Sequence, residues 1–167
     1  MSYIFAVVVG VLALGADQFS KYYFATNFLE AESRPAINGF FEWNFVKNRG
    51  AAWGMLDGHT WLLLAFTVVA MLVCIALLVK SGKKNKLLFW SITLILSGGL
   101  GNMIDRIFRG YVVDFIHLQF MDFPVFNVAD CVIVIGAGLL MLNFILDFKA
   151  SSKQKNEIVL PDDIAEE

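Results

Sequence analysis

Residues 61–79 read WLLLAFTVVAMLVCIALLV and contain no charged side chain. Because a transmembrane helix needs about 20 mostly apolar residues, this stretch predicts a membrane span. Three other segments have the same apolar character: Tyr3 to about Phe19, with Phe24 as its outer limit; Leu87 to about Ile104; and about Val128 to Phe148. The sequence therefore predicts an all-α membrane protein with four transmembrane helices.

The composition supports this fold class. Of the 167 residues, 58% are hydrophobic and 17% are charged, whereas globular domains average about 45–50% and about 25%. One soluble core of this size cannot bury so many apolar side chains. The net charge of −2 gives no basic excess, so nucleic acid is not an expected partner. Two cysteines in apolar runs and only two histidines disfavour a disulfide framework, a metal site and a Ser-His-Asp triad. We expect no metal and no cofactor.

The first span has an alternative interpretation as a cleaved signal peptide, because small residues lie at suitable positions in Ala13–Ala16. No Lys or Arg precedes them, so the charged region that begins a signal peptide is missing. A retained span is the favoured interpretation. The chain has no lipobox of its own, since Met71–Cys74 carries Val73 where a small residue is needed.

Lysines indicate the orientation, because Lys and Arg accumulate in cytoplasmic connections. They crowd the connection between the second and third spans and follow the fourth span: Lys80, Lys83, Lys84, Lys86, Lys149, Lys153 and Lys155. Both termini are therefore predicted to be cytoplasmic, and the long connections at about 25–60 and 107–127 to face outward. Residues 1–150 form the membrane domain in this scheme, and residues 151–167 form a polar, disordered cytoplasmic tail.

Both outward connections contain extended segments. Ile37–Val46 alternates between two sides, with Phe41, Trp43 and Phe45 on one and polar residues on the other. Tyr111–Leu118 is rich in β-branched and aromatic residues. We expect these segments to form a small extracytoplasmic β-layer on the outer leaflet.

Charges near the outward ends of the spans need an explanation, since a charge at bilayer depth costs at least about 2.5–3.5 kcal/mol. Asp17 and Lys21 are four residues apart and share a helix face, which favours a structural ion pair over a direct role in a site. In the third span, Gly98, Asn102 and Asp105 form a polar stripe of small residues beside Arg106. Two structural interpretations compete with a role of this stripe in a functional site. One is a packing seam, in which Gly98, Gly99 and Gly101 permit close helix contact. The other is a structural ion pair between Arg106 and Asp105.

Asp114 and Asp130 are the candidate catalytic residues. Asp114 interrupts the apolar run Val112–Ile116, and Asp130 opens the fourth span, where Asn127 is suited to cap the helix. Helix capping alone is a sufficient alternative for Asp130. If the two carboxylates meet, one keeps a proton, and the pair can supply a general acid and a general base to activate water. Desolvation in the apolar strand favours the proton on Asp114.

At these residues the chain resembles the bacterial prolipoprotein signal peptidase family, signal peptidase II. Five motifs carry the resemblance, in order along about Val11 to Leu146: DQFSK at 17–21, NRGAAWG at 48–54, GNMIDR at 101–106, VVDF at 112–115 and FPVFNVAD at 123–130. Trp53 departs from the Phe that the family pattern leads us to expect, but it keeps a bulky aromatic there.

The resemblance implies an aspartic endopeptidase that removes the signal peptide of diacylglyceryl-modified prolipoproteins, cutting just before the lipidated cysteine. It implies catalysis by Asp114 and Asp130 without metal, at the extracytoplasmic face of the bacterial cytoplasmic membrane, and inhibition by the cyclic peptide globomycin. Polar residues that would line the site are Asn48, Asn102, Arg106 and Asn127. Residues with structural or indirect roles would be Asp17, Lys21, Gly50 and Asp105.

Other functions fit the sequence less well. A transporter predicts charges near the bilayer midplane and inverted repeats, whereas the charges here cluster at one face and no repeat is visible. A presenilin-like protease predicts Tyr-Asp and Gly-x-Gly-Asp motifs, which are absent. A non-catalytic scaffold leaves Asp114 and Asp130 unexplained.

Overall fold

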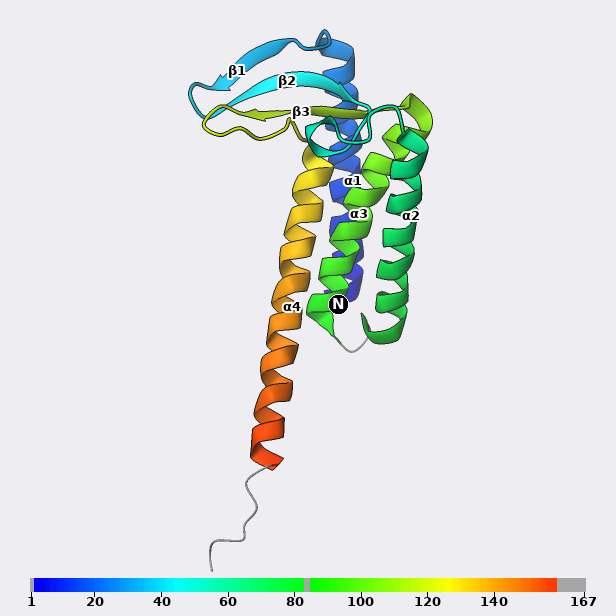
Figure 1. Ribbon diagram of the computed structural model, residues 1–167, viewed down its shortest axis with the longest axis vertical. Helices are drawn as coiled ribbons and strands as arrows, with labels where there is room; N and C mark the ends of the chain where they lie inside the picture. Colours follow the sequence, from blue (N-terminus) through cyan, green and yellow to red (C-terminus); the bar gives the residue numbers. More distant parts are fainter. Residues whose placement is uncertain (1, 83–84, 159–167) are drawn as a thin grey trace, which may run out of the picture.

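The computed structural model describes residues 2–82 and 85–158, which form four long helices and a small sheet (Figure 1). The helices are α1 (Ser2–Asn27), α2 (Thr60–Leu77), α3 (Lys86–Arg109) and α4 (Val128–Ile158). All four are long and apolar enough to cross a membrane. The predicted fold class is confirmed.

The helices pack around α3, and small residues permit the close contact between α3 and α4. A Cβ on Gly98 would collide with the backbone oxygen of Ala129, and one on Gly136 would lie 2.8 Å from the backbone oxygen of Ser91. The predicted seam is therefore present at Gly98. A Cβ on Gly99 would meet nothing nearer than 3.8 Å, so this glycine is not required for packing.

An antiparallel sheet lies across one end of the helix bundle, which we call the sheet end (Figure 1). Its strands, in order, are β1 (Ser33–Ile37), β2 (Phe41–Asn48) and β3 (Val112–Leu118). The predicted strand over Tyr111–Leu118 is confirmed as β3. The strand predicted at Ile37–Val46 is confirmed from Phe41 onward as part of β2, but its start is wrong, because the chain turns at Gly39, where φ is +74°. Ile37 instead ends β1, a second strand that the sequence pattern did not indicate.

Aromatic residues fix the sheet to α1. Phe24 on α1 stacks on Phe115 of β3 with ring centroids 4.1 Å apart, and it also contacts Phe28 and Trp43. Phe115 and its neighbour Val113 are fully buried in this cluster. Because β3 is held at both residues, Asp114 between them has a fixed position above the bundle.

The end of α4 differs from the expected boundary. The tail was predicted to begin at residue 151, but α4 continues to Ile158. Residues 159–167 lie outside the described residues, as do Lys83 and Lys84 of the lysine cluster. The start of α1 and the end of α4 both lie away from the sheet end (Figure 1).

Candidate active site

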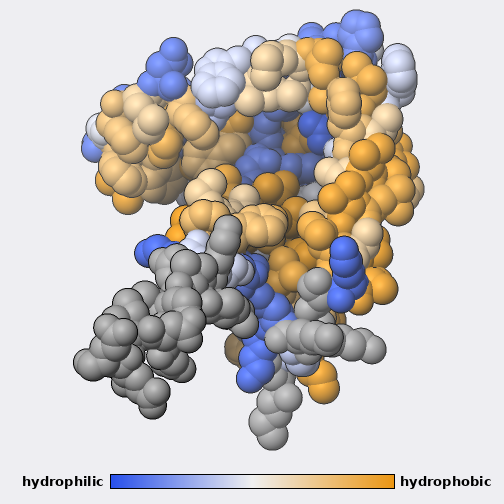
Figure 2. All heavy atoms as spheres, turned by 60° about the horizontal axis from the view of Figure 1, so that its bottom comes forward, coloured by the Kyte–Doolittle hydropathy of each residue, from blue (hydrophilic) through white to orange (hydrophobic). Residues whose placement is uncertain are grey.

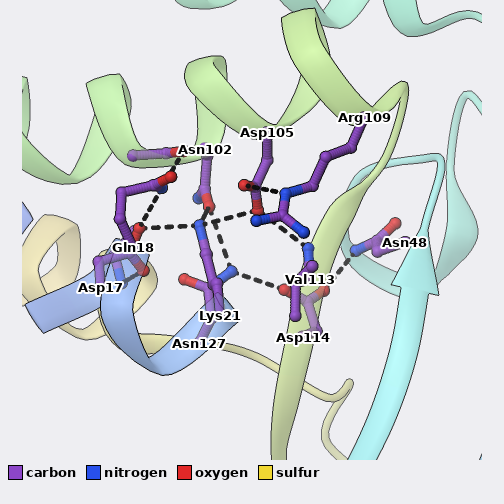
Figure 3. Close-up of polar contacts among 12 residues, drawn as sticks. Asp17, Gln18, Lys21, Asn48, Asn102, Asp105, Arg109, Val113, Asp114 and Asn127 are labelled. Carbon is purple, nitrogen blue, oxygen red and sulfur yellow. Dashed lines mark hydrogen bonds and ion pairs between the residues drawn. The ribbon is translucent and has the colours of Figure 1, made fainter. Parts of the chain in front are cut away.

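A buried ammonium group lies at the base of the site. Lys21 of α1 is fully buried, and its Nζ lies 3.0 Å from Asp17 Oδ2 and 3.3 Å from Asp105 Oδ2. The same nitrogen donates a 2.7 Å hydrogen bond to Asn102 Oδ1 (Figure 3). A buried charge needs such partners, because desolvation otherwise costs several kcal/mol. The predicted pair of Asp17 and Lys21 is present as the centre of a larger network.

The two carboxylates of this network hold neighbouring elements. Asp17 Oδ1 accepts a 2.9 Å hydrogen bond from the backbone N–H of Ala129, at the start of α4. Asp105 Oδ2 accepts one of 3.1 Å from the N–H of Val113 in β3, and its Oδ1 lies 3.3 Å from Arg109 Nε. Asp105 therefore pairs with Lys21 and Arg109, and the alternative pair with Arg106 is wrong. The network fixes both segments that carry the candidate catalytic residues.

Two asparagines connect Asp114 and Asp130, and a third holds Asp114. Asn102 Nδ2 donates to Asp130 Oδ1 at 2.8 Å, and Asn102 Oδ1 accepts from Asn127 Nδ2 at 3.1 Å. Asn127 Nδ2 also donates to Asp114 Oδ1 at 2.6 Å. Asn48 Nδ2 donates to the other oxygen of Asp114 at 2.8 Å. Each carboxylate is thus held in one orientation by amide donors.

The start of α4 is capped as the sequence predicts. Asn127 Oδ1 accepts from the N–H of Asp130 at 3.0 Å, and Asp130 Oδ2 accepts from the N–H of Asn127 at 3.1 Å. This reciprocal pair is a capping box, which satisfies two otherwise unpaired donors. One oxygen of Asp130 serves the cap, while the other faces Asn102. Asp130 therefore does cap the helix, as the alternative interpretation predicts, but capping occupies only one of its two carboxylate oxygens.

Arg106 closes the side of the site next to the loop after β2. Its Nη2 donates to the backbone oxygen of Gly50 at 3.0 Å, and its Nε is buried without a hydrogen-bond partner in the described part of the chain. The N–H of Gly50 donates to Asn48 Oδ1 at 2.9 Å. A Cβ at Gly50 would lie 2.6 Å from the backbone oxygen of Met55, so a larger residue would displace the loop.

Asp114 and Asp130 line one cavity of about 320 Å³, which we call the dyad chamber. Its other lining residues include Asn48, Asn102, Arg106 and the apolar Phe123 and Phe126. At Asn102 and Arg106 it meets an apolar groove of about 330 Å³ between α2, α3 and α4, which we call the lateral groove and which residues such as Leu63, Phe66 and Met71 line. Figure 2 shows hydrophilic atoms at the base of a hollow that hydrophobic side chains surround.

The environment of Asp114 favours its neutral form. Burial and the nearby Asp130 carboxylate raise the pKa of Asp114 to about 7, although hydrogen bonds from Asn48 and Asn127 act in the opposite direction. Desolvation and like charge nevertheless outweigh them.

All ten residues singled out from the sequence lie in this connected network or line its cavities. Four participants lie outside these ten: Gln18, which donates to Asp17 at 3.1 Å, Arg109, and the backbone N–H groups of Val113 and Ala129. The i,i+4 spacing of Asp105 and Arg109 could have indicated that pair. The N–H of Val113, 8 residues after Asp105, could not be recognised from the sequence, because every residue except proline has a backbone N–H.

The sequence profile of the family described as signal peptidase (SPase) II matches residues 9–146. The chain belongs to the signal peptidase II family. It is therefore a protease, and with its four membrane-capable helices it is a multi-pass membrane protein.

Curated relatives and solved structures agree with this assignment. The chain is 39% identical over 149 residues to the lipoprotein signal peptidase of Enterococcus faecalis, covering 89% of this chain and 92% of that one. It is 43% identical over 145 residues to that of Caldanaerobacter subterraneus, covering 86% and 97%. A solved bacterial membrane enzyme structure, obtained by the in meso method at 2.3 Å resolution, superimposes with a TM-score of 0.81 at 32% identity, covering 86% of this chain and 88% of that one.

Proposed function

We propose that this protease removes the signal peptide from diacylglyceryl-modified prolipoproteins and cuts the bond just before the lipidated cysteine. Its relatives are lipoprotein signal peptidases. The observation that carries the catalytic part of the proposal is that Asp114 and Asp130 line one cavity and are joined through Asn102 and Asn127. Two carboxyl groups in one desolvated chamber can share a proton and activate water.

Each carboxyl group has a distinct role in the proposed reaction. Asp130 lies at the positive end of the α4 dipole, acts as the general base, and takes a proton from the attacking water. Asp114 is neutral at the start and donates a hydrogen bond to the scissile carbonyl. It then transfers its proton to the amide nitrogen as the C–N bond breaks. The raised pKa of Asp114, about 7, supports this division.

Arg106 and the asparagines position the reacting groups. Arg106 lines both the dyad chamber and the lateral groove, and its unpartnered Nε leaves it donor capacity for a developing oxyanion. Asn48 and Asn127 hold Asp114, and Asn102 holds Asp130, through amide hydrogen bonds. Lys21 supports this arrangement indirectly, through Asn102.

The lateral groove offers a route from the bilayer to the dyad chamber. A signal peptide is apolar and membrane-resident, and the groove is lined mostly by apolar residues of three helices. We place the sheet end at the extracytoplasmic face of the bacterial cytoplasmic membrane and both termini in the cytoplasm, because Lys80 and Lys86 flank the opposite connection. Globomycin would act by occupying the same chamber.

The test is cleavage by purified protein in lipid-containing micelles. The substrate is a diacylglyceryl-modified prolipoprotein, with the unmodified precursor as its matched control, and mass spectrometry identifies the new N-terminus. We expect cleavage only of the modified substrate, before the cysteine, at the same rate with and without a chelator. Cleavage at another bond, or equal cleavage of the unmodified precursor, would contradict the proposal.

A further inference from the structure

A second cavity lies next to the dyad chamber and has a different character. It has a volume of about 410 Å³, and we call it the loop chamber. Its walls come from the turn after α1, the end of β2, the loop at 49–57 and the segment 124–125, so no residue of the four long helices lines it. The loop chamber is thus built from loops and strands of the sheet end, and it shares Ala51 with the lateral groove.

The two chambers meet at the candidate catalytic residue. Asn48, Asp114 and Val125 line both of them. Ala51 lines the lateral groove, the dyad chamber and the loop chamber, so the three cavities adjoin at the loop after β2. A polypeptide whose apolar end lies in the groove and whose scissile bond lies at Asp114 can continue into the loop chamber.

The backbone at Val125 is open to a further extended chain. Phe126 pairs with β3, donating to the oxygen of Ile116 at 3.0 Å and accepting from the N–H of Ile116 at 2.8 Å. In an extended segment, neighbouring residues direct their backbone groups to opposite sides. Val125 accordingly makes no backbone hydrogen bond within the described chain. A free edge of this kind is where a peptide adds to a sheet.

The charges of the loop chamber leave one cation and one anion without an ion-pair partner in the described chain. Lys47 forms a 2.8 Å ion pair with Glu30, so its charge has a partner. Asp57 lines the chamber too and accepts a hydrogen bond from the N–H of Gly58 at 2.9 Å, which leaves its negative charge uncompensated. Arg49 is exposed and makes no hydrogen bond or ion pair with any described residue. Its guanidinium can therefore pair with a carboxylate on a bound peptide.

We propose that the loop chamber binds the first residues after the cleaved bond, as an extended chain along the free edge at Val125, and that Arg49 makes it favour an acidic over a basic side chain there. This inference rests on the proposed function, because it takes the polypeptide to run from the groove past Asp114. It names a specificity residue that lies outside the catalytic machinery.

The experiment uses one diacylglyceryl-modified prolipoprotein with Asp, Ser or Lys at residues 2, 3 or 4 counted from the lipidated cysteine. We expect wild-type kcat/KM to be at least about threefold higher for Asp than for Lys at one of these positions, mainly through KM, as for an exposed ion pair. Arg49→Gln should abolish the preference, and Arg49→Glu should reverse it.

Two controls separate a local site from general charge attraction. Arg34→Glu changes an exposed arginine of β1 that pairs with Glu32 and does not line the chamber, so the Asp-to-Lys ratio should stay as in wild type. The same Asp and Lys replacements ten residues further along the substrate should have no effect. N-methylation of the substrate backbone at the sensitive position should raise KM, because it removes a donor to Val125.

The possible results distinguish the two proposals. If wild-type protein cleaves none of the substrates before the cysteine, the proposed function fails, and this inference fails with it. If all substrates are cleaved there at equal rates, or if Arg34→Glu alters the ratio as Arg49→Glu does, the inference is overturned and the proposed function stands.

Discussion

Replacement of Lys21 by methionine should destabilise the protein strongly. The ammonium is fully buried and lies 3.0 and 3.3 Å from the carboxylates of Asp17 and Asp105, which are themselves 1% and 0% exposed. Methionine has a similar length but no charge, so both carboxylates lose their buried partner. Breaking a buried ion pair from one side costs about 3–5 kcal/mol.

The corresponding change in melting temperature is large enough to measure. For a chain of about 150–250 residues, 1 kcal/mol shifts the Tm by about 2–4 °C, so Lys21→Met should lower it by about 6–20 °C. Thermal unfolding in detergent micelles measures this shift. The matched control is Lys47→Met, which breaks the exposed ion pair with Glu30 and should change the Tm little. Adding Asp17→Asn to Lys21→Met should restore part of the loss, because one uncompensated carboxylate is removed. Equal Tm values for Lys21→Met and Lys47→Met would refute the reasoning.

Three further outcomes are expected. Arg106→Ala should lower kcat by about 10²-fold or more with a smaller effect on Tm, because it removes a donor beside the dyad; a normal kcat in the folded fraction would exclude this role. The kcat/KM should fall above about pH 7. Asp114, with its pKa raised to about 7, is protonated below that pH and loses its proton above it. A flat pH profile through this range would count against Asp114 as the initial acid. Single cysteines at Ser81 and Ser152 should be labelled only from the cytoplasm and one at Thr60 only from outside, and outside labelling of Ser81 would invert the proposed orientation.

The spans could be predicted from the sequence because hydropathy is a local property. Residues 61–79 need no partner to indicate a helix in a membrane, and α2 extends over Thr60–Leu77. The cap of α4 is equally local, since Asn127 and Asp130 are three residues apart and satisfy each other. The hairpin at Gly39 was missed because the aromatic alternation of β2 was extended backward through a turn.

Long-range pairing could not be predicted from the residues alone. Asn102 on its own is only a polar residue at depth, and its partners come from two distant segments: Lys21 on α1, and Asn127 with Asp130 at the start of α4. Asp105 could have paired with either neighbouring arginine, and only the packing of β3 and α1 around it determines that it binds Lys21 and Arg109. The motif resemblance indicated that these residues belong to one site, but not which atom binds which.

The central claim is that Asp114 and Asp130 act as a catalytic pair, and single-turnover cleavage tests it most directly. Purified Asp114→Asn and Asp130→Asn proteins, checked for an unaltered fold, are mixed in excess with a diacylglyceryl-modified prolipoprotein. Asp122→Asn is the control, because this exposed acid lies on the same connection but does not line the dyad chamber. We predict that each dyad variant loses about 10²–10⁴-fold in rate, as expected for loss of a general acid or base, while the control cleaves normally. A folded dyad variant that keeps more than about a tenth of the wild-type rate would contradict the account.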